Sequence, residues 1–176
     1  FAAVFAPILT QYSPTKVTVS DAFLTPSLKH FAGTDDLGRD IFSRIIYGCR
    51  VSLSVGIISQ IIATVIGYTM GVCAGYYGGK VDSVISFLIQ VFSSFPFLLF
   101  AMAIMFVLGP GLINLYLALG LLGWASTARL IRGDVMRLKK MEYIDACKVS
   151  GGNSFRIIMK HLLPNCLSTL IVTVTL

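Results

Sequence analysis

Two long stretches without a charged side chain constrain this sequence more than any other feature. Residues 51–79 and residues 83–128 contain no Asp, Glu, Lys or Arg, whereas 12% of the 176-residue chain is charged. A helix needs about 20 apolar residues to cross the roughly 30 Å hydrocarbon core of a membrane. The first stretch therefore has room for one membrane-spanning helix and the second for two, separated by the Gly-Pro-Gly at residues 109–111. With 56% hydrophobic residues, the composition also excludes a disordered or collagen-like chain.

Apolar runs too short to span a membrane lie at both ends of the sequence. Residues 1–9 are predicted to be the end of a first span, and the run after His161 is predicted to begin a last one. Short interfacial or re-entrant segments are the alternative for both runs. For residues 1–9 the tail of a signal peptide is a further alternative, but a basic start and a small-residue cleavage pattern are missing. The expected fold class is an all-α, polytopic membrane helix bundle.

The polar stretch at residues 10–50 precedes the first charge-free stretch. Its prolines and scattered Ser and Thr predict irregular structure as far as about His30. Apolar residues at helical spacing between 41 and 46 then predict a short amphipathic helix, capped by Thr34 or Asp35. Such a helix fits a position at the membrane surface, and an ordinary solvated helix remains the alternative.

A row of small residues marks the second span, which is predicted from about Val51 to Tyr76. The row has a strict spacing of four and comprises Ser59, Ala63, Gly67, Gly71 and Gly75. This spacing places small side chains on one helical face, where another helix can approach closely in lipid. The alternative is that glycine is simply common in spans. We expect Ala63, Gly67, Gly71 and Gly75 to form a helix-packing face.

A third span is predicted at residues 83–108 and a fourth at 112–128. The third contains Pro96, which is expected to kink it, and the polar residues Gln90, Ser93 and Ser94. These polar side chains either line a water-filled path or only satisfy the carbonyl that proline leaves unpaired.

The charge distribution predicts the topology. Residues 129–160 carry most of the excess positive charge of the chain, which is +6 overall. Basic residues concentrate in cytoplasmic loops, so this segment is placed inside and residues 10–50 outside. No nucleic-acid-binding module accompanies the basic residues, so nucleic acid is not an expected partner, whereas membrane lipid is.

The residue types needed for catalysis or metal binding are sparse. The four cysteines lack metal-ligand spacing and are expected to be small buried residues. The only histidines, His30 and His161, are far apart in the sequence. No nucleophile–base pair, phosphate-binding loop or metal site can be assembled, so the chain is not expected to be an enzyme or to bind a cofactor. An ion channel subunit is an alternative class, although no selectivity-filter ring is visible.

The basic segment predicts two helices joined by a glycine turn. Gly151 and Gly152 stop the first helix, and Asn153 or Ser154 can cap the second. The apolar residues expected on the two helices include Val149 and Phe155. A connector between neighbouring spans needs only a few residues, so this segment is expected to bind something in the cytosol.

This helical pair resembles the signature loop of permease subunits in bacterial ABC importers. That signature is Glu-Ala-Ala, three residues, Gly, nine residues, Ile, any residue, Leu-Pro. Here Asp145-Ala146-Cys147, Gly151, His161 and Leu163-Pro164 stand at those positions with the same spacing, following Glu142. The sequence departs from the signature with Asp for Glu, Cys for the second Ala, and His for Ile.

A second resemblance rests on other residues. The segments at 33–53, 75–82 and 94–96 are similar to the C-type second permease subunits of the dipeptide, oligopeptide and nickel branch. Together the two resemblances cover residues 31–166.

The resemblance implies a type I importer permease of which this sequence is a fragment of a six-span subunit. Residues 1–9 would end the first span, 10–50 would form an extracytoplasmic segment with an interfacial helix, and 51–176 would form the transmembrane domain with a cytoplasmic coupling loop at 129–161. The residues expected to carry ATPase coupling are Glu142, Asp145, Ala146, Cys147, Gly151, His161, Leu163 and Pro164.

The resemblance also implies partners and a location. The expected partners are a second permease subunit, two ABC ATPase subunits that hold ATP and Mg²⁺, and an extracellular or periplasmic solute-binding protein. The subunit would cross the bacterial inner membrane several times. The expected solutes are di- or oligopeptides, with nickel or another small solute as the alternative.

Overall fold

The computed structural model describes residue 3 and residues 5–175, whose regular secondary structure consists of helices and one isolated bridge between Thr34 and Asp40. Residues 1, 2 and 4 of the predicted first-span end, and Leu176 of the predicted last span, lie outside the described residues. The chain forms two compact units, Phe1–Ile57 and Ile58–Leu176. The helical fold class predicted from the sequence is confirmed.

The first unit is a hydrogen-bonded loop that leads into a long helix. It holds α1 (Ala6–Leu9), the short 3₁₀ helix η1 (Val19–Asp21) and the beginning of α2 (Ile41–Tyr77). Backbone bonds join Thr18 N to Leu37 O at 3.1 Å and Ile41 N to Gly33 O at 3.1 Å, so the loop closes on itself before α2 begins. Gly38 has a φ of 67°, and a Cβ there would collide with the carbonyl of Thr18. Only glycine fits that position without strain.

Helix α2 is continuous over 37 residues, from Ile41 to Tyr77. The prediction of a short helix followed by a separate span was therefore wrong, because no helix-breaking residue interrupts the sequence between them. The predicted cap was also wrong. Asp40, not Thr34 or Asp35, caps the helix, since its Oδ2 accepts a hydrogen bond from Ser43 N at 2.8 Å. The extracytoplasmic placement of residues 10–50 stays a prediction.

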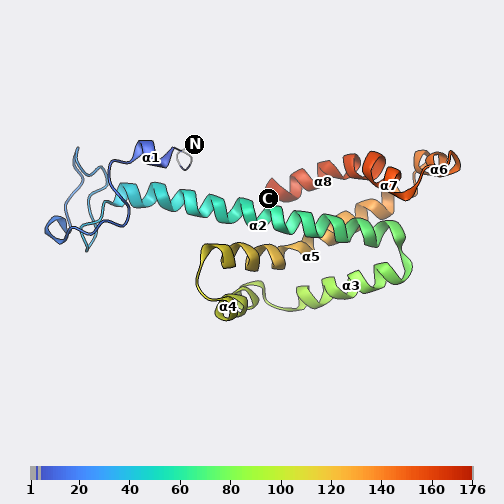
Figure 1. The fold of residues 1–176 in the computed structure, drawn as a ribbon, viewed down its shortest axis with the longest axis horizontal. Helices are drawn as coiled ribbons and strands as arrows, with labels where there is room; N and C mark the ends of the chain where they lie inside the picture. The colour runs from blue at the N-terminus through green and yellow to red at the C-terminus, as the bar shows by residue number, and fades with distance from the viewer. Residues whose placement is uncertain (1–2, 4, 176) are drawn as a thin grey trace. The chain divides into compact units, whose positions relative to one another are not determined.

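The second unit packs the rest of α2 with the later helices. In chain order these are α3 (Gly79–Ser94), α4 (Phe97–Leu108), α5 (Leu112–Leu138), α6 (Glu142–Val149), α7 (Ser154–Ile157), the π-helical turn η2 (Ile158–Leu162) and α8 (Leu163–Thr175). Helix α5 is central, because α3, α4 and α8 all contact it (Figure 1). Its buried residues recur along its length at helical spacing from Ala118 to Leu138.

Among the described residues, α2 is the one helix long and apolar enough to cross a membrane by itself. Helices α3 and α4 meet the same criterion only as a pair, and they are bent by 90° where they join. The third span was predicted as one kinked helix, but the helix ends at Ser94. Phe95 is extended, with φ −90° and ψ 138°, as the residue before a proline tends to be, and Pro96 opens α4. Proline therefore breaks this segment rather than bending it.

Helix α5 differs from the predicted fourth span at its C-terminal end. The span was expected to end near Ala128, but the helix continues to Leu138. The reason is that Ile131, Val135 and Leu138 are buried at helical spacing, so the amphipathic pattern extends past the last charge-free residue. By length and composition α5 is not among the candidate membrane spans.

The small residues of α2 face α5 within the same chain. A Cβ added at Gly67 would lie 2.6 Å from Thr127 Cβ, one at Gly71 2.9 Å from Ile131 Cβ, and one at Gly75 2.8 Å from Val135 Cβ. Ala63 continues this face, since a Cβ added at Gly123 on α5 would lie 3.0 Å from the Cβ of Ala63. The two backbones approach too closely for a larger side chain at these positions.

Candidate functional site

The segment between α5 and α8 folds as two short helices joined by a glycine turn. Helix α6 ends in a Schellman motif, in which Gly152 N donates to Cys147 O at 2.9 Å and Gly151 N donates to Lys148 O at 3.0 Å. Gly151 has a φ of 78°, a conformation that other residues resist. A Cβ on Gly152 would lie 2.6 Å from Cys147 Sγ. The two glycines are therefore needed for different reasons, one for its backbone angle and one for space.

The second helix begins at an ordinary cap and changes its winding further on. Of the two predicted caps, Asn153 and Ser154, it is Asn153 whose side chain accepts a hydrogen bond from Arg156 N, at 2.8 Å. After α7 the five residues of η2 wind as a π-helical turn immediately before Leu163 and Pro164. Proline has no N–H for the helical ladder, and a π-helical turn is one local adjustment that accommodates it.

A hydrophobic cluster holds this helical pair to the ends of the long helices. Its members come from six elements, and each is at most 7% exposed. They are Val72, Ile131, Val135, Leu138, Ile144, Ile157, Leu162 and Cys166. Each of the two short helices supplies an anchor, Ile144 from α6 and Ile157 from α7. The loop is thus a packed extension of α5 and not a free connector.

The predicted coupling residues lie mostly on the surface. Glu142, Asp145, Ala146, Gly151 and Pro164 are exposed, whereas Cys147, His161 and Leu163 are half-buried. The structure does not bring them together into one cluster with a shared polar partner.

One of the acids has an immediate local partner. Asp145 Oδ1 accepts from Lys148 Nζ at 2.7 Å, and the two side chains are 64% and 41% exposed. Such a pair contributes about 0–1 kcal/mol. The charge of Asp145 is therefore offset by a lysine of the same chain.

Two residues that were predicted to belong to the apolar part of these helices, Val149 and Phe155, are exposed. Val149 is 89% exposed and Phe155 is 72% exposed. Phe155 precedes the buried Ile157 by two residues, and residues two apart cannot share a helical face. That spacing was the available signal. We call Tyr143, Val149, Phe155 and Met159, all exposed, the apolar loop surface.

Polar contacts attach the end of α5 to its neighbours. Arg132 Nε and Nη2 donate to the carboxylate of Asp82 on α3 at 2.5 and 2.7 Å. Lys139 Nζ donates to the carbonyl of Tyr76 at 2.5 Å, next to the end of α2. Asp134 accepts from Thr169 on α8. These contacts join residues that lie far apart in the sequence, and none of them was predicted.

The polar residues of the third predicted span have different roles. Ser94 Oγ donates to Gln90 O at 2.8 Å, so it satisfies a carbonyl just before the break at Pro96. Ser93 Oγ instead accepts from Arg129 Nη2 at 2.8 Å. Both serines and Gln90 are exposed.

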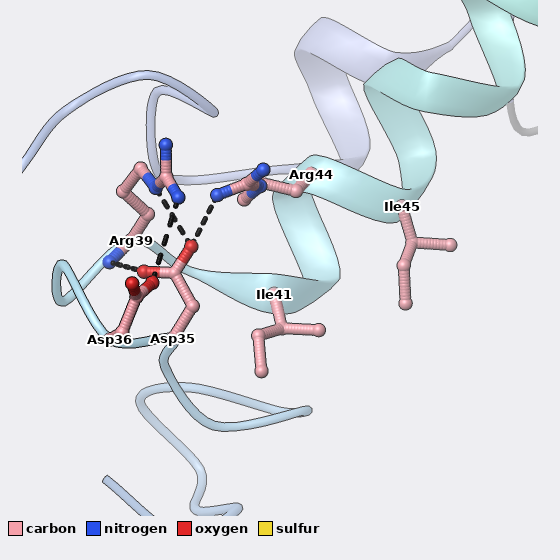
Figure 2. Close-up of a pocket in the computed structure, with 6 residues that line it drawn as sticks. All are labelled: Asp35, Asp36, Arg39, Ile41, Arg44 and Ile45. Atoms are coloured by element: carbon pink, nitrogen blue, oxygen red, sulfur yellow. Dashed lines mark hydrogen bonds and ion pairs between the residues drawn. The ribbon is translucent and has the colours of Figure 1, made fainter. Parts of the chain in front are cut away.

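In the first unit, the charged residues of the Gly33–Asp40 segment bind one another. Figure 2 shows the Asp35 carboxylate facing the guanidinium groups of Arg39 and Arg44. It also accepts backbone hydrogen bonds from Leu37 at 3.0 Å and Arg39 at 2.9 Å. Desolvation raises the pKa of Asp35, but these hydrogen bonds outweigh it and hold the pKa at about 2. These contacts fix the conformation of the segment that leads into α2.

A buried pair lies beside that entry. His30 Nδ1 is 2.9 Å from Asp40 Oδ1, and the two side chains are 6% and 4% exposed. The ring of His30 stacks on Tyr12 with 4.7 Å between centroids. Within residues 3 and 5–175, no group of three or more His, Cys, Asp or Glu side chains is placed to hold a metal ion.

Residues 63–176 match the family model described as binding-protein-dependent transport system inner membrane component. Over 99% of its length, the chain is 42% identical to the dipeptide transport system permease protein of Bacillus subtilis (strain 168), of which it covers 54%. It is 36% identical to the oligopeptide transport system permease protein of the same organism and covers 57% of it.

A third relative is named for a different solute, glutathione. The chain is 40% identical, over 84% of its length, to the glutathione transport system permease protein of Pectobacterium atrosepticum, and covers 49% of it. The chain thus spans about half the length of the curated relatives it matches.

Proposed function

Since this chain belongs to the family of inner membrane components of binding-protein-dependent transport systems, we propose that it is part of a permease subunit of an ATP-driven importer for di- or oligopeptides. The relatives named above are dipeptide, oligopeptide and glutathione permeases, and glutathione is itself a small peptide. Their names favour peptides over nickel or another small solute. The subunit would cross the bacterial inner membrane several times.

One observation carries the proposal: an exposed helical pair is packed onto the end of α5 at the position of the importer signature. Its inner face is fixed by Ile144, Ile157 and Leu162, which are at most 1% exposed. Its outer face presents the apolar loop surface with the exposed Glu142. Exposed apolar side chains on a packed base are typical of a protein-binding surface. We assign its partner as an ABC ATPase subunit.

In the proposed mechanism, movement of this loop displaces α5. The ATPase subunits bind ATP and Mg²⁺ and change their separation, and each docked loop follows its subunit. Because the loop shares a hydrophobic cluster with α5 and α8, its displacement acts on those helices. The contacts of Arg132 with α3 and of Lys139 with the end of α2 would carry the displacement further. Solute delivered by the binding protein would then pass between this subunit and a second permease subunit.

Competition for uptake tests the proposed solute. The complete transporter is placed in proteoliposomes with ATP inside and its binding protein outside, and uptake of labelled dialanine is measured. Excess unlabelled tripeptide should reduce this uptake, whereas nickel should not. Uptake of nickel with no uptake of dialanine would contradict the peptide assignment.

A further inference from the structure

Helix α3 carries a polar face in an otherwise apolar part of the chain. Asp82, Ser86, Gln90 and Ser93 follow one another at intervals of four, four and three residues, so they lie on one side of the helix. Helix α5 packs beside α3 and supplies two arginines to this region, Arg129 and Arg132 (Figure 1 shows the two helices). We call the surface formed by Gln90, Ser93 and Arg129 the α3–α5 polar surface.

The two arginines have contrasting partners. Arg132 is neutralised by Asp82, to which it donates two hydrogen bonds. Arg129 donates to the hydroxyl of Ser93, which carries no charge. Within the described part of the chain, Arg129 makes no ion pair. One arginine is thus a closed structural contact, whereas the other retains its positive charge.

The charge of Arg129 follows directly on 46 charge-free residues, 83–128. An exposed arginine at the end of a charge-free segment can face an aqueous path and bind an anion there. Its guanidinium is exposed, and Ser93 occupies only one of the five N–H donors that arginine has. The remaining donors match the planar geometry of a carboxylate.

We propose that Arg129, with Ser93 and Gln90 beside it, binds the carboxylate of the transported solute on its way through the permease. This inference rests on the proposed function, since it supposes that a peptide passes this surface. Peptides of any sequence share a free C-terminal carboxylate, so a single arginine can serve a permease that accepts many of them. Ser93 positions the guanidinium, and Gln90 offers an amide on the same face of α3.

The experiment compares dialanine with dialanine amide, which lacks the carboxylate. Uptake of each is measured in proteoliposomes that hold the complete transporter and its binding protein. The variants are Arg129→Gln, Arg129→Lys and Ser93→Ala. Arg137→Gln is the matched control, an exposed arginine of the same helix that pairs with Asp134. The binding protein is the same throughout, so its own preference cancels when variants are compared.

We expect Arg129→Gln to lower uptake of dialanine about tenfold, the scale of one charged hydrogen-bonding contact. Uptake of the amide should change by less than about twofold. The preference for the acid is the uptake of dialanine relative to that of its amide. Arg129→Lys should retain part of this preference, and Ser93→Ala should weaken it slightly. Arg137→Gln should leave it unchanged.

If Arg129→Gln lowered the uptake of dialanine and of dialanine amide equally, the inference would be overturned, because an equal loss would indicate a structural or coupling role. So would an effect that disappears in vesicles of neutral lipid, which would assign the arginine to a lipid phosphate. If the unaltered transporter carries no dialanine, the proposed function falls and the inference falls with it. Uptake by the unaltered transporter with an unchanged preference in Arg129→Gln removes the inference alone.

Discussion

The guanidinium of Arg132 on α5 donates hydrogen bonds to both carboxylate oxygens of Asp82 on α3, across 50 residues of sequence. Two hydrogen bonds in one fork fix the direction as well as the distance of the contact. The pair joins the beginning of α3 to the helix that leads into the helical pair α6 and α7.

Removing both members of this pair should destabilise the transporter by less than the sum of the two single removals. Arg132→Ala or Asp82→Ala leaves a partly buried charge without its partner, and each should cost about 1–2 kcal/mol. The double variant should cost less than the sum of the two. Thermal unfolding of the detergent-purified complex measures all three. Strictly additive losses would mean that the two side chains do not interact.

The close approach of α2 to α5 predicts a severe effect at Gly71. Gly71→Leu must displace Ile131, and overpacking of this kind costs about 1–3 kcal/mol. Val65→Leu is the matched control, because Val65 is 59% exposed on the same helix. Since the contact lies within one chain, the loss should appear as reduced yield of this subunit itself, measured by fluorescence-detected size exclusion. Equal behaviour of the two variants would exclude the packing face.

The left-handed turn at Gly151 should separate conformational from chemical effects. Gly151→Val places a β-branched side chain at φ 78° and should distort the turn, at a cost of about 1–3 kcal/mol. Gly151→Asn should be tolerated, since asparagine adopts this conformation more readily. Retention of the ATPase subunits on the purified membrane subunits is the measurement. If Gly151→Asn lost as much of the ATPase subunits as Gly151→Val, the backbone angle would not be the cause of the loss.

The lowered pKa of Asp35 predicts how the first unit responds to acid. A carboxylate whose folded pKa is about 2 stabilises the fold above its unfolded pKa of about 3.9. That contribution is lost as the pH falls through about 2. Asp35→Asn should therefore expose the Leu37 and Arg39 amides at neutral pH, seen as faster hydrogen exchange. Asp36→Asn is the control, because the Asp36 side chain is 66% exposed. Equal exchange in the two variants would contradict the assigned role of Asp35.

The sequence predicted those features that depend on local spacing. The four-residue spacing of Gly67, Gly71 and Gly75 indicated a close helix contact, although it did not say that α5 is the partner. The glycines at 151–152 and the cap at Asn153 followed from the chemistry of helix ends.

Features that depend on tertiary packing could not be predicted. A proline in an apolar segment is compatible with a kink or a break, and contacts beyond the segment decide between them. The extension of α5 to Leu138 depends on burial of Val135 against residues that lie far apart in the sequence. The contact of Arg129 with Ser93 joins residues that are 36 positions apart.

The most direct test of the account is ATP-dependent dipeptide uptake by the complete transporter when the apolar loop surface is altered. Phe155→Asp changes only an exposed side chain, so the membrane subunits should fold and assemble normally. We predict that the variant loses its ATPase subunits on purification and that dialanine uptake in proteoliposomes falls at least about tenfold. Full ATPase retention with normal uptake would contradict the claim that this helical pair couples the permease to ATP hydrolysis.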